Sequence, residues 1–220
     1  MAKDAPFETH HQRYEAWFGE HEAAYISELL ALRPFIPWEG RGLEIGVGSG
    51  RFAAPLGIQV GLDPSPAMLS HAAARGIETV EGIAENLPFT DCSFDHSLVV
   101  TTICFVDSAE KMLAEAYRVL KPEGRLIIGF IDRESDIGQD YLAHQDTSIF
   151  YRNATFYSAG EVEQLLLETG FSIDTWAQTL ANPLPETRTI EPLYPGRGRC
   201  AFVVVTAAKQ TAYESIAKPV

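Results

Sequence analysis

The stretch "GLEIGVGSG", residues 42–50, places three glycines two residues apart directly after a short apolar run. The apolar run predicts a buried strand. Glycine tolerates a left-handed backbone and lets a ligand approach the main chain closely, so the stretch predicts a ligand-binding turn at the end of that strand. The acidic residue within the run, Glu44, is suited to a nearby ammonium or sulfonium group.

Strand-like and helix-like segments alternate around this turn. Apolar runs predict strands at residues 41–47, 58–63, 77–82, 93–102, 125–132, 171–180 and 199–208. Helical periodicity predicts helices at residues 7–32, 65–76, 108–124 and 159–170. The alternation indicates βαβ units in an α/β fold, with a mainly parallel sheet covered on both faces.

The composition limits the kind of protein. At 220 residues, 46% hydrophobic and 21% charged, the chain has the length for one sizeable core. A net charge of −13 makes a nucleic-acid partner unfavourable, because phosphate backbones attract basic proteins. We therefore expect a single domain with additions and a partner other than nucleic acid.

Cysteine usage and hydropathy indicate the compartment. Cys92, Cys104 and Cys200 are widely spaced and form no metal-ligand pattern, so no metal site is expected. The first ten residues have no apolar signal-peptide core, and no apolar run reaches the length of a membrane span. The sequence predicts a reduced, cytoplasmic protein.

The second predicted strand ends in Asp63, beside the glycine turn. A carboxylate at this position can accept hydrogen bonds from both hydroxyls of a ribose. Gly46, Gly48 and Gly50 form G-x-G-x-G, whereas dinucleotide-binding turns have G-x-G-x-x-G, and Arg51 stands where their third glycine belongs. The pattern favours a nucleoside with a cationic group over NAD(P), so an oxidoreductase is the weaker alternative.

Four ordered segments, "LEIGVGSGRF" at 43–52, "VGLDPSPAML" at 60–69, "GIAENLPFTDCSFD" at 82–95 and "AEAYRVLKPEGRLII" at 114–128, resemble the class I S-adenosylmethionine-dependent methyltransferases. The resemblance covers roughly residues 7–207 and is to the small, single-domain, methyltransferase-11-like type. It implies a Rossmann-like, doubly wound sheet of seven mostly parallel strands with an antiparallel last strand. It also implies S-adenosylmethionine as cofactor and S-adenosylhomocysteine as product.

The resemblance assigns roles around the glycine turn. Backbone groups of the turn would hold the methionine part of the cofactor, Asp63 the ribose, and the start of the next helix the adenine. Tyr14 and Trp17 resemble an aromatic pair that closes over the cofactor. The residues that the resemblance places at the cofactor in these regions are Tyr14, Trp17, Glu44, Gly46, Val47, Gly48, Gly50, Asp63, Pro64 and Met68.

Two further segments complete the predicted cofactor site. The resemblance places Gly82, Ile83 and Ala84 at the adenine, although many relatives have Asp where this chain has Ile83. Glu85 either reads the adenine edge or is structural. Thr101, after the fourth strand, is expected to contact the cofactor.

The sequence divides into a helical cap at 1–38, a methyltransferase domain at 39–208 and a tail at 209–220. The aperiodic stretch at about 132–158 is predicted to be an inserted lid. We expect the acceptor pocket between the cap, the segment after the fourth strand and this lid. The lid carries four aromatic residues and two arginines that are candidates for acceptor contacts, namely Phe150, Tyr151, Phe156, Tyr157, Arg133 and Arg152.

The predicted function is methyl transfer from S-adenosylmethionine to a small molecule, with a non-catalytic S-adenosylmethionine-binding protein as the other alternative. Direct displacement at a sulfonium requires alignment and exclusion of water more than a covalent enzyme intermediate, so Cys104 is not expected to be a nucleophile. No spacing selects a general base, and the oligomeric state stays open. The candidate bases by position are Asp107, Asp132, Glu134 and His144.

Overall fold

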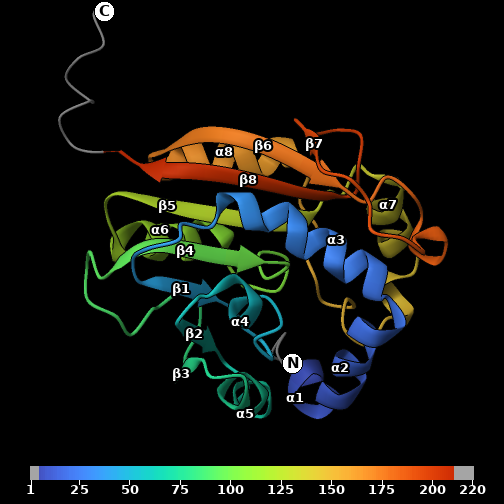
Figure 1. Ribbon diagram of the computed structural model, residues 1–220, viewed down its shortest axis with the longest axis horizontal. Coiled ribbons are helices and arrows are strands. Elements are labelled where there is room, and N and C mark those ends of the chain that lie inside the picture. The colour runs from blue at the N-terminus through green and yellow to red at the C-terminus, as the bar shows by residue number, and fades with distance from the viewer. Residues whose placement is uncertain (1–4, 211–220) are drawn as a thin grey trace, which may run out of the picture.

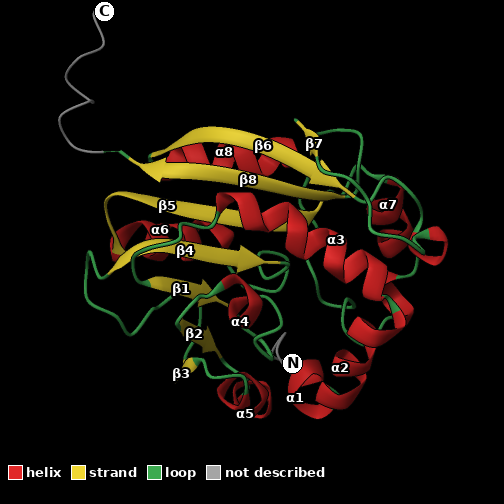
Figure 2. Ribbon diagram, viewed as in Figure 1, coloured by secondary structure: helices red, strands yellow, loops and turns green. Residues whose placement is uncertain are grey.

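Eight strands form one mixed sheet at the centre of the computed structural model, which describes residues 5–210 (Figures 1 and 2). Their order is β3-β2-β1-β4-β5-β8-β6-β7. The first five strands in chain order pair in parallel, and β8 lies antiparallel between β5 and β6. The strands are β1 (Gly42–Ile45), β2 (Val60–Asp63), β3 (Glu78–Glu81), β4 (Phe94–Val100), β5 (Leu120–Ile131), β6 (Phe171–Thr179), β7 (Tyr194–Pro195) and β8 (Phe202–Lys209). The Rossmann-like, mostly parallel sheet and its antiparallel last strand are confirmed.

The predicted number of strands, seven, was wrong by one. The additional strand, β7, has two residues and pairs with Ala177 and Gln178 at the edge of the sheet. Two residues are too few to produce a visible alternation of apolar and polar side chains, and this strand lies in a proline-rich stretch. It extends the edge away from the glycine turn and leaves the rest of the topology unchanged.

Helices cover both faces of the sheet, as a doubly wound fold requires (Figure 1). Side chains of α3, α4 and α5 pack with one face, and those of α6 and α8 with the other. Successive side chains of β5 point to opposite faces of the sheet. Leu126 and Ile128 pack on the face covered by α6 and α8, and Ile127 packs on the face covered by α3, α4 and α5. The helices are α1 (Ala5–Thr9), α2 (His11–Glu20), α3 (Glu22–Leu32), α4 (Ala53–Leu56), α5 (Pro66–Ala74), α6 (Ala109–Val119), α7 (Asp136–Ala143) and α8 (Ala159–Thr169), with 3-10 turns at Arg33–Phe35, Gln145–Thr147 and Leu184–Glu186.

The N-terminal region is three helices where one was predicted. The backbone leaves the helical conformation at His10 and His21, neither of which is a proline or glycine. Apolar spacing continues across both breaks, so periodicity alone does not locate them. The breaks turn α1 and α2 away from the sheet, whereas α3 packs across the face of β5, β6 and β8.

The predicted lid, residues 132–158, holds α7, one 3-10 turn and extended segments. In Figure 1 α7 lies at the end of the sheet where α3 meets α2. Beyond residue 210, the predicted tail lies outside the described residues. Among residues 5–210 no helix combines the length and apolar character needed to cross a membrane.

Candidate active site

A cavity of about 540 Å³ opens at the carboxyl ends of β1, β2 and β4. Within the sheet, β2 and β4 are the two neighbours of β1, so the strand order reverses at β1. The loops that follow β1 and β4 therefore run in opposite directions. Ligands of open α/β sheets bind in the crevice at such a switch point. Helices α1, α2 and α3 and the loop after α7 supply the wall that faces the strand ends.

The glycine turn after β1 uses its three glycines for three different purposes. Gly46 has φ +75°, and a Cβ there would lie 2.3 Å from the side chain of Thr102. Gly50 allows α5 to pack closely, since its Cβ would lie 3.1 Å from the Cα of Ala72. Gly48, with φ +50°, faces the cavity. The turn therefore presents backbone to the cavity at Gly46 and Gly48, and it packs closely on neighbouring side chains or backbone at Gly46 and Gly50.

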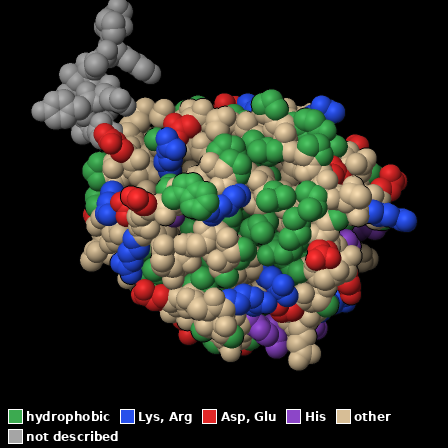
Figure 3. Space-filling view, viewed as in Figure 1, with side chains coloured by type: hydrophobic (Ala, Val, Ile, Leu, Met, Phe, Trp, Pro, Cys, Tyr) green, Lys and Arg blue, Asp and Glu red, His purple; other side chains and the backbone are tan. Residues whose placement is uncertain are grey.

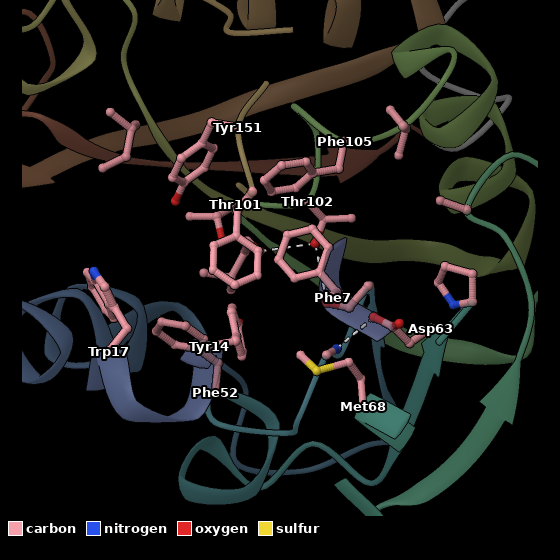
Figure 4. Close-up of a pocket in the computed structure, with 18 of the residues that line it drawn as sticks. Phe7, Tyr14, Trp17, Phe52, Asp63, Met68, Thr101, Thr102, Phe105 and Tyr151 are labelled. Carbon is pink, nitrogen blue, oxygen red and sulfur yellow. Dashed lines mark hydrogen bonds between the residues drawn. The ribbon is translucent and has the colours of Figure 1, made fainter. Parts of the chain in front are cut away.

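Asp63 ends β2 beside this turn. Its carboxylate accepts hydrogen bonds from the backbone N–H of Gly48 at 2.9 Å and of Ser65 at 3.0 Å. Ser65 caps α5 as predicted, with its hydroxyl accepting from the N–H of Met68. Pro64 and Met68 line the cavity next to the carboxylate. Asp63 is thus fixed in place by the turn and faces the same space (Figure 4).

Glu44 and Val47 lie behind the turn and outside the cavity wall. Glu44 is 1% exposed, and burial raises the pKa of its carboxyl well above the usual value. One buried oxygen of this carboxyl has no hydrogen-bond partner among residues 5–210. Val47 packs on Gly61 of β2. A buried polar atom without a partner is a feature of ligand sites more than of plain cores.

The segment after β3 supplies another part of the wall. Ile83, Ala84 and Glu85 line the cavity, whereas Gly82 packs toward the core. Glu85 accepts a hydrogen bond from the backbone N–H of Asp107 at 2.6 Å, which joins this segment to the loop before α6. Glu85 therefore has a structural role in addition to its place in the wall.

Thr101 directly follows β4 and has φ +50°, which is unusual for a threonine. Its N–H donates to the carbonyl of Gly129 at 2.7 Å, so the neighbouring strand holds the strained residue in place. Thr101 and Thr102 both line the cavity. Cys104 is buried and donates its thiol hydrogen to the carbonyl of Thr101. Strain of this kind is found often at functional sites.

Helix α2 directs two aromatic side chains toward the cavity (Figure 4). The hydroxyl of Tyr14 lies 3.5 Å from the position that a Cβ on Gly48 would occupy. Burial, and next the carboxyl of Glu44, raise the pKa of Tyr14, which keeps the phenol neutral. Trp17 stacks on His21 at 5.0 Å. The predicted aromatic pair thus stands opposite the glycine turn.

Aromatic contacts join α1 to the predicted lid. The ring of Phe7 meets Tyr14, Phe105 and Phe150 with centroid distances of 5.7, 4.9 and 5.1 Å. Tyr151 stacks on Phe105 at 5.6 Å. Phe7 was not among the predicted site residues, because a single aromatic residue near the start of the predicted helix gives no sign that it faces a cavity.

The remaining lid residues lie elsewhere. Phe156 and Tyr157 line a second cavity of about 20 Å³ beside Thr101. Arg133 forms an ion pair with Glu161, and Arg152 is exposed and donates to a backbone carbonyl. Neither arginine lines the large cavity, so the expectation that they bind an anionic group of the acceptor was wrong.

The structure separates the predicted cofactor residues into two groups. Those that line the cavity are Tyr14, Trp17, Gly46, Gly48, Asp63, Pro64, Met68, Ile83, Ala84, Glu85 and Thr101. Those that support the wall from behind are Glu44, Val47, Gly50 and Gly82. Of the candidate bases only Asp107 reaches the cavity, whereas Asp132, Glu134 and His144 do not.

A carboxyl that the sequence analysis overlooked also lines the cavity. Glu28 of α3 is 5% exposed, and burial raises its pKa to about 8. Glu28 lies on the same helical face as the buried residues Ala24 and Leu32, four positions away on either side. An acidic residue within an apolar helical stripe is the feature of the sequence that could have marked Glu28 as a site residue.

An ion cluster fixes the N-terminal helices to the glycine turn. One carboxylate oxygen of Glu15, on α2, lies 2.7 Å from Arg51 and 2.6 Å from Arg75. Arg75 also donates to the carbonyl of Ser49. The residue that replaces the third dinucleotide glycine, Arg51, therefore attaches α2 to the loop below it.

These residues fit S-adenosylmethionine. The turn offers unobstructed backbone at Gly48, Asp63 offers a fixed carboxylate at the end of β2, and Glu44 keeps an unpartnered buried oxygen nearby. The neutral phenol of Tyr14 faces the turn from the other side. A nucleoside with a cationic amino-acid tail matches this set of donors and acceptors.

Comparison with known proteins gives consistent results. A family model described as a methyltransferase domain matches residues 43–128. The crystal structure of an S-adenosylmethionine-dependent methyltransferase from Thermotoga maritima, described as a possible histamine N-methyltransferase, superposes with a TM-score of 0.92 and 47% identity, covering 94% of this chain and 100% of that chain. An uncharacterized protein of Methanocaldococcus jannaschii is 42% identical over 92% of this chain and 98% of its own length. An uncharacterized protein of Mycobacterium tuberculosis is 37% identical over 90% of this chain and 71% of its own length.

Proposed function

The chain belongs to the class I S-adenosylmethionine-dependent methyltransferases, and we propose that its methyl acceptor is a small molecule. It is an enzyme that uses S-adenosylmethionine, so neither an NAD(P)-dependent oxidoreductase nor a non-catalytic binding protein describes it. The observation that carries the proposal is the enclosure of the acceptor side of the cavity by aromatic rings of α1, α2 and the predicted lid.

The surface supports the same proposal. Lys, Arg, Asp and Glu side chains are interspersed on the face shown in Figure 3, without a continuous basic track. A net charge of −13 adds long-range repulsion toward a nucleic acid. A macromolecular acceptor needs an open path to the reacting methyl group, whereas the contact of Phe7 with Phe105 and Phe150 narrows that path.

We propose the following roles for the residues of the site. Backbone groups from Gly46 to Gly50 hold the methionine part, with Glu44 behind them and Tyr14 opposite. Asp63 binds the ribose hydroxyls. Pro64, Met68 and residues 82–85 enclose the adenine, with backbone groups near Ala84 reading its edge because the side chain of Ile83 cannot accept a hydrogen bond. Trp17 closes over the cofactor, and Thr101 contacts it from the end of the fourth strand.

The regions outside the sheet also have proposed roles. We propose that residues 1–38 act as a cap and residues 132–158 as a lid over the acceptor. The lid has few regular elements, and its rings meet the cap through side-chain contacts such as that of Phe7 with Phe150. Such an arrangement admits an acceptor without disturbing the sheet.

A labelling experiment tests the acceptor class. The enzyme is incubated with methyl-labelled S-adenosylmethionine and, separately, a set of small amines, phenols and carboxylic acids, total tRNA and a protein extract. Histamine is included because of the description of the Thermotoga maritima relative. We expect label in acid-soluble small molecules. Label confined to acid-precipitable tRNA or protein would contradict the proposal.

A further inference from the structure

Glu28 is a buried carboxyl that faces the cavity. Its side chain leaves α3 from the middle of a face that otherwise packs on the sheet, and it is 5% exposed. Its remaining exposure is toward the cavity, whose wall includes it. Within residues 5–210 no hydrogen bond or ion pair joins this carboxyl to another group. A buried acid of this kind is costly, so a role in packing or capping does not account for it.

The surroundings of Glu28 place it on the acceptor side of the cavity. Glu28 is among the groups that raise the pKa of Tyr14, Tyr141 and Tyr151, so its carboxyl shares a poorly solvated space with their hydroxyls. All four residues line the cavity, and the Tyr14 hydroxyl lies 3.5 Å from the position of a Cβ on Gly48, in the glycine turn. Tyr141 and Tyr151 belong to the predicted lid.

The charges that line the cavity favour a cationic or N–H-bearing ligand. Two side chains of the cavity wall can carry a positive charge, Arg13 and His21, and Arg13 is exposed to solvent. The carboxyl side chains of the wall are Glu20, Glu28, Asp63, Glu85 and Asp107. Aromatic faces beside a carboxylate are the usual surroundings of a bound amine.

We propose that Glu28 binds the methyl acceptor directly and that this acceptor is an amine. This inference rests on the proposed function, because it assigns the acceptor of the same reaction. The carboxylate accepts a hydrogen bond from the acceptor N–H and thereby directs the nitrogen lone pair toward the methyl group. A carboxylic acid or an alcohol without a basic nitrogen cannot form a hydrogen-bonded ion pair with the carboxylate of Glu28.

The proposed step balances. The lone pair of the acceptor nitrogen forms the N–C bond as the C–S bond breaks, and the bonding pair returns to sulfur, which becomes a neutral thioether. The nitrogen is then cationic, and its N–H proton passes to the carboxylate of Glu28. Burial gives Glu28 a pKa of about 8, close to the range in which a general base is most effective. The nearby titratable groups are Tyr14, Tyr141, Tyr151 and His21, of which the three phenols stay neutral.

Calorimetry on the full chain tests the binding role. The complex with S-adenosylhomocysteine is titrated with histamine, 2-phenylethylamine and the matched alcohol 2-phenylethanol, for the wild type, Glu28→Gln and Glu28→Asp. Glu22→Gln is the control, because Glu22 is exposed on the same helix and away from the cavity. Titrations in two buffers with different heats of ionisation report the protons released when the amine binds.

We expect at least one amine to bind the wild type and to bind Glu28→Gln at least 100-fold more weakly, with Glu28→Asp between them and Glu22→Gln unchanged. Below pH 8 the wild type should release about one proton more than Glu28→Gln. S-adenosylhomocysteine should bind all four proteins with affinities within about threefold, since Glu28 lies away from the cofactor side. A purely structural Glu28 would not alter proton release.

The outcomes separate the two proposals. If the wild type does not bind S-adenosylhomocysteine, the assignment as a methyltransferase is itself contradicted. Intact S-adenosylhomocysteine binding without amine binding or amine methylation would overturn the role of Glu28 alone. Equal amine affinity of the wild type and Glu28→Gln, or a preference for 2-phenylethanol, would overturn it as well.

Discussion

The wall of the cavity formed after β1 and β2 consists largely of backbone and short side chains, whereas the wall facing it consists of aromatic rings and one buried carboxyl. The first wall is fixed by strands that pair with their neighbours, and Asp63 is bonded to Gly48 within it. The second wall is assembled from α1, α2, α3 and the predicted lid, which contact one another through side chains. Under the proposed roles, cofactor binding depends mainly on the first wall and acceptor choice mainly on the second, with Tyr14 of α2 reaching toward the glycine turn.

The largest expected effect concerns the pH dependence of stability. Because burial raises the pKa of Glu28 from about 4.5 to about 8, the unfolded chain loses this proton before the folded chain does. Stability is therefore lost as the pH rises from about 4.5 to 8, by at most about 5 kcal/mol. Urea denaturation between pH 5 and 8 should show a steeper loss in the wild type than in Glu28→Gln, which keeps Glu44 as a buried carboxyl of raised pKa. Parallel curves for these two proteins would contradict it.

A methyl group on the bare backbone of the first wall should abolish most cofactor binding. In Gly48→Ala the new Cβ lies 3.3 Å from Met68 and 3.5 Å from Tyr14, at φ +50°. We expect S-adenosylhomocysteine to bind at least 100-fold more weakly, about 3 kcal/mol. Gly57→Ala is the matched control, because Gly57 has φ +77° and open space around it. Equal affinities of the two variants would show that the turn does not contact the cofactor.

Removal of the carboxylate at the end of β2 should have the next largest effect. Asp63→Ala is expected to weaken S-adenosylhomocysteine binding roughly 10- to 150-fold, since a hydrogen bond to a charged group contributes about 1.5–3 kcal/mol. Calorimetry measures the dissociation constant. Asp91, which is mostly exposed and paired with Arg118, provides the control Asp91→Ala. An unchanged dissociation constant in Asp63→Ala would refute the ribose role.

The smallest expected effect is on stability, from the ion pairs of Glu15 with Arg51 and Arg75 that join α2 to the glycine turn. Hydrogen bonds from Arg51 and Arg75 lower the pKa of Glu15 despite its partial burial, so its carboxylate stabilises the fold above about pH 4.5 and loses that effect as the pH falls. Glu15→Gln should lower the free energy of unfolding by about 1 kcal/mol at pH 7. The difference from the wild type should shrink between pH 7 and pH 3, because the carboxylate of Glu15 takes up a proton as the pH falls. The same difference at both pH values would exclude the charge as its cause.

The first wall was largely predictable from the sequence. Gly48 and Asp63 were recognisable because a turn with positive φ beside a strand-end carboxylate imposes residue types at fixed spacing. The packing of Gly50 on Ala72 and the burial of Glu44 behind the turn were not predictable, since both depend on how the next elements approach.

The second wall was only partly predictable. The lid and the aromatic pair of α2 were expected at the cavity, but Phe7 and Glu28 were missed and Arg133 was misplaced. Phe7 and Phe150 are far apart in the chain, and nothing local in the sequence encodes their contact. Glu28 lies four residues from Ala24 and from Leu32 in the apolar stripe of α3, but the stripe alone does not show that the carboxyl faces a cavity.

The most direct test of the account is a calorimetric titration of the wild type with S-adenosylmethionine, S-adenosylhomocysteine and NADH, repeated with Asp63→Ala and Glu28→Gln. We expect micromolar binding of the first two ligands and none of NADH, with affinity lost in Asp63→Ala and retained in Glu28→Gln. Binding of NADH alone, or an equal loss of cofactor affinity in both variants, would contradict the division of the cavity into a cofactor wall and an acceptor wall.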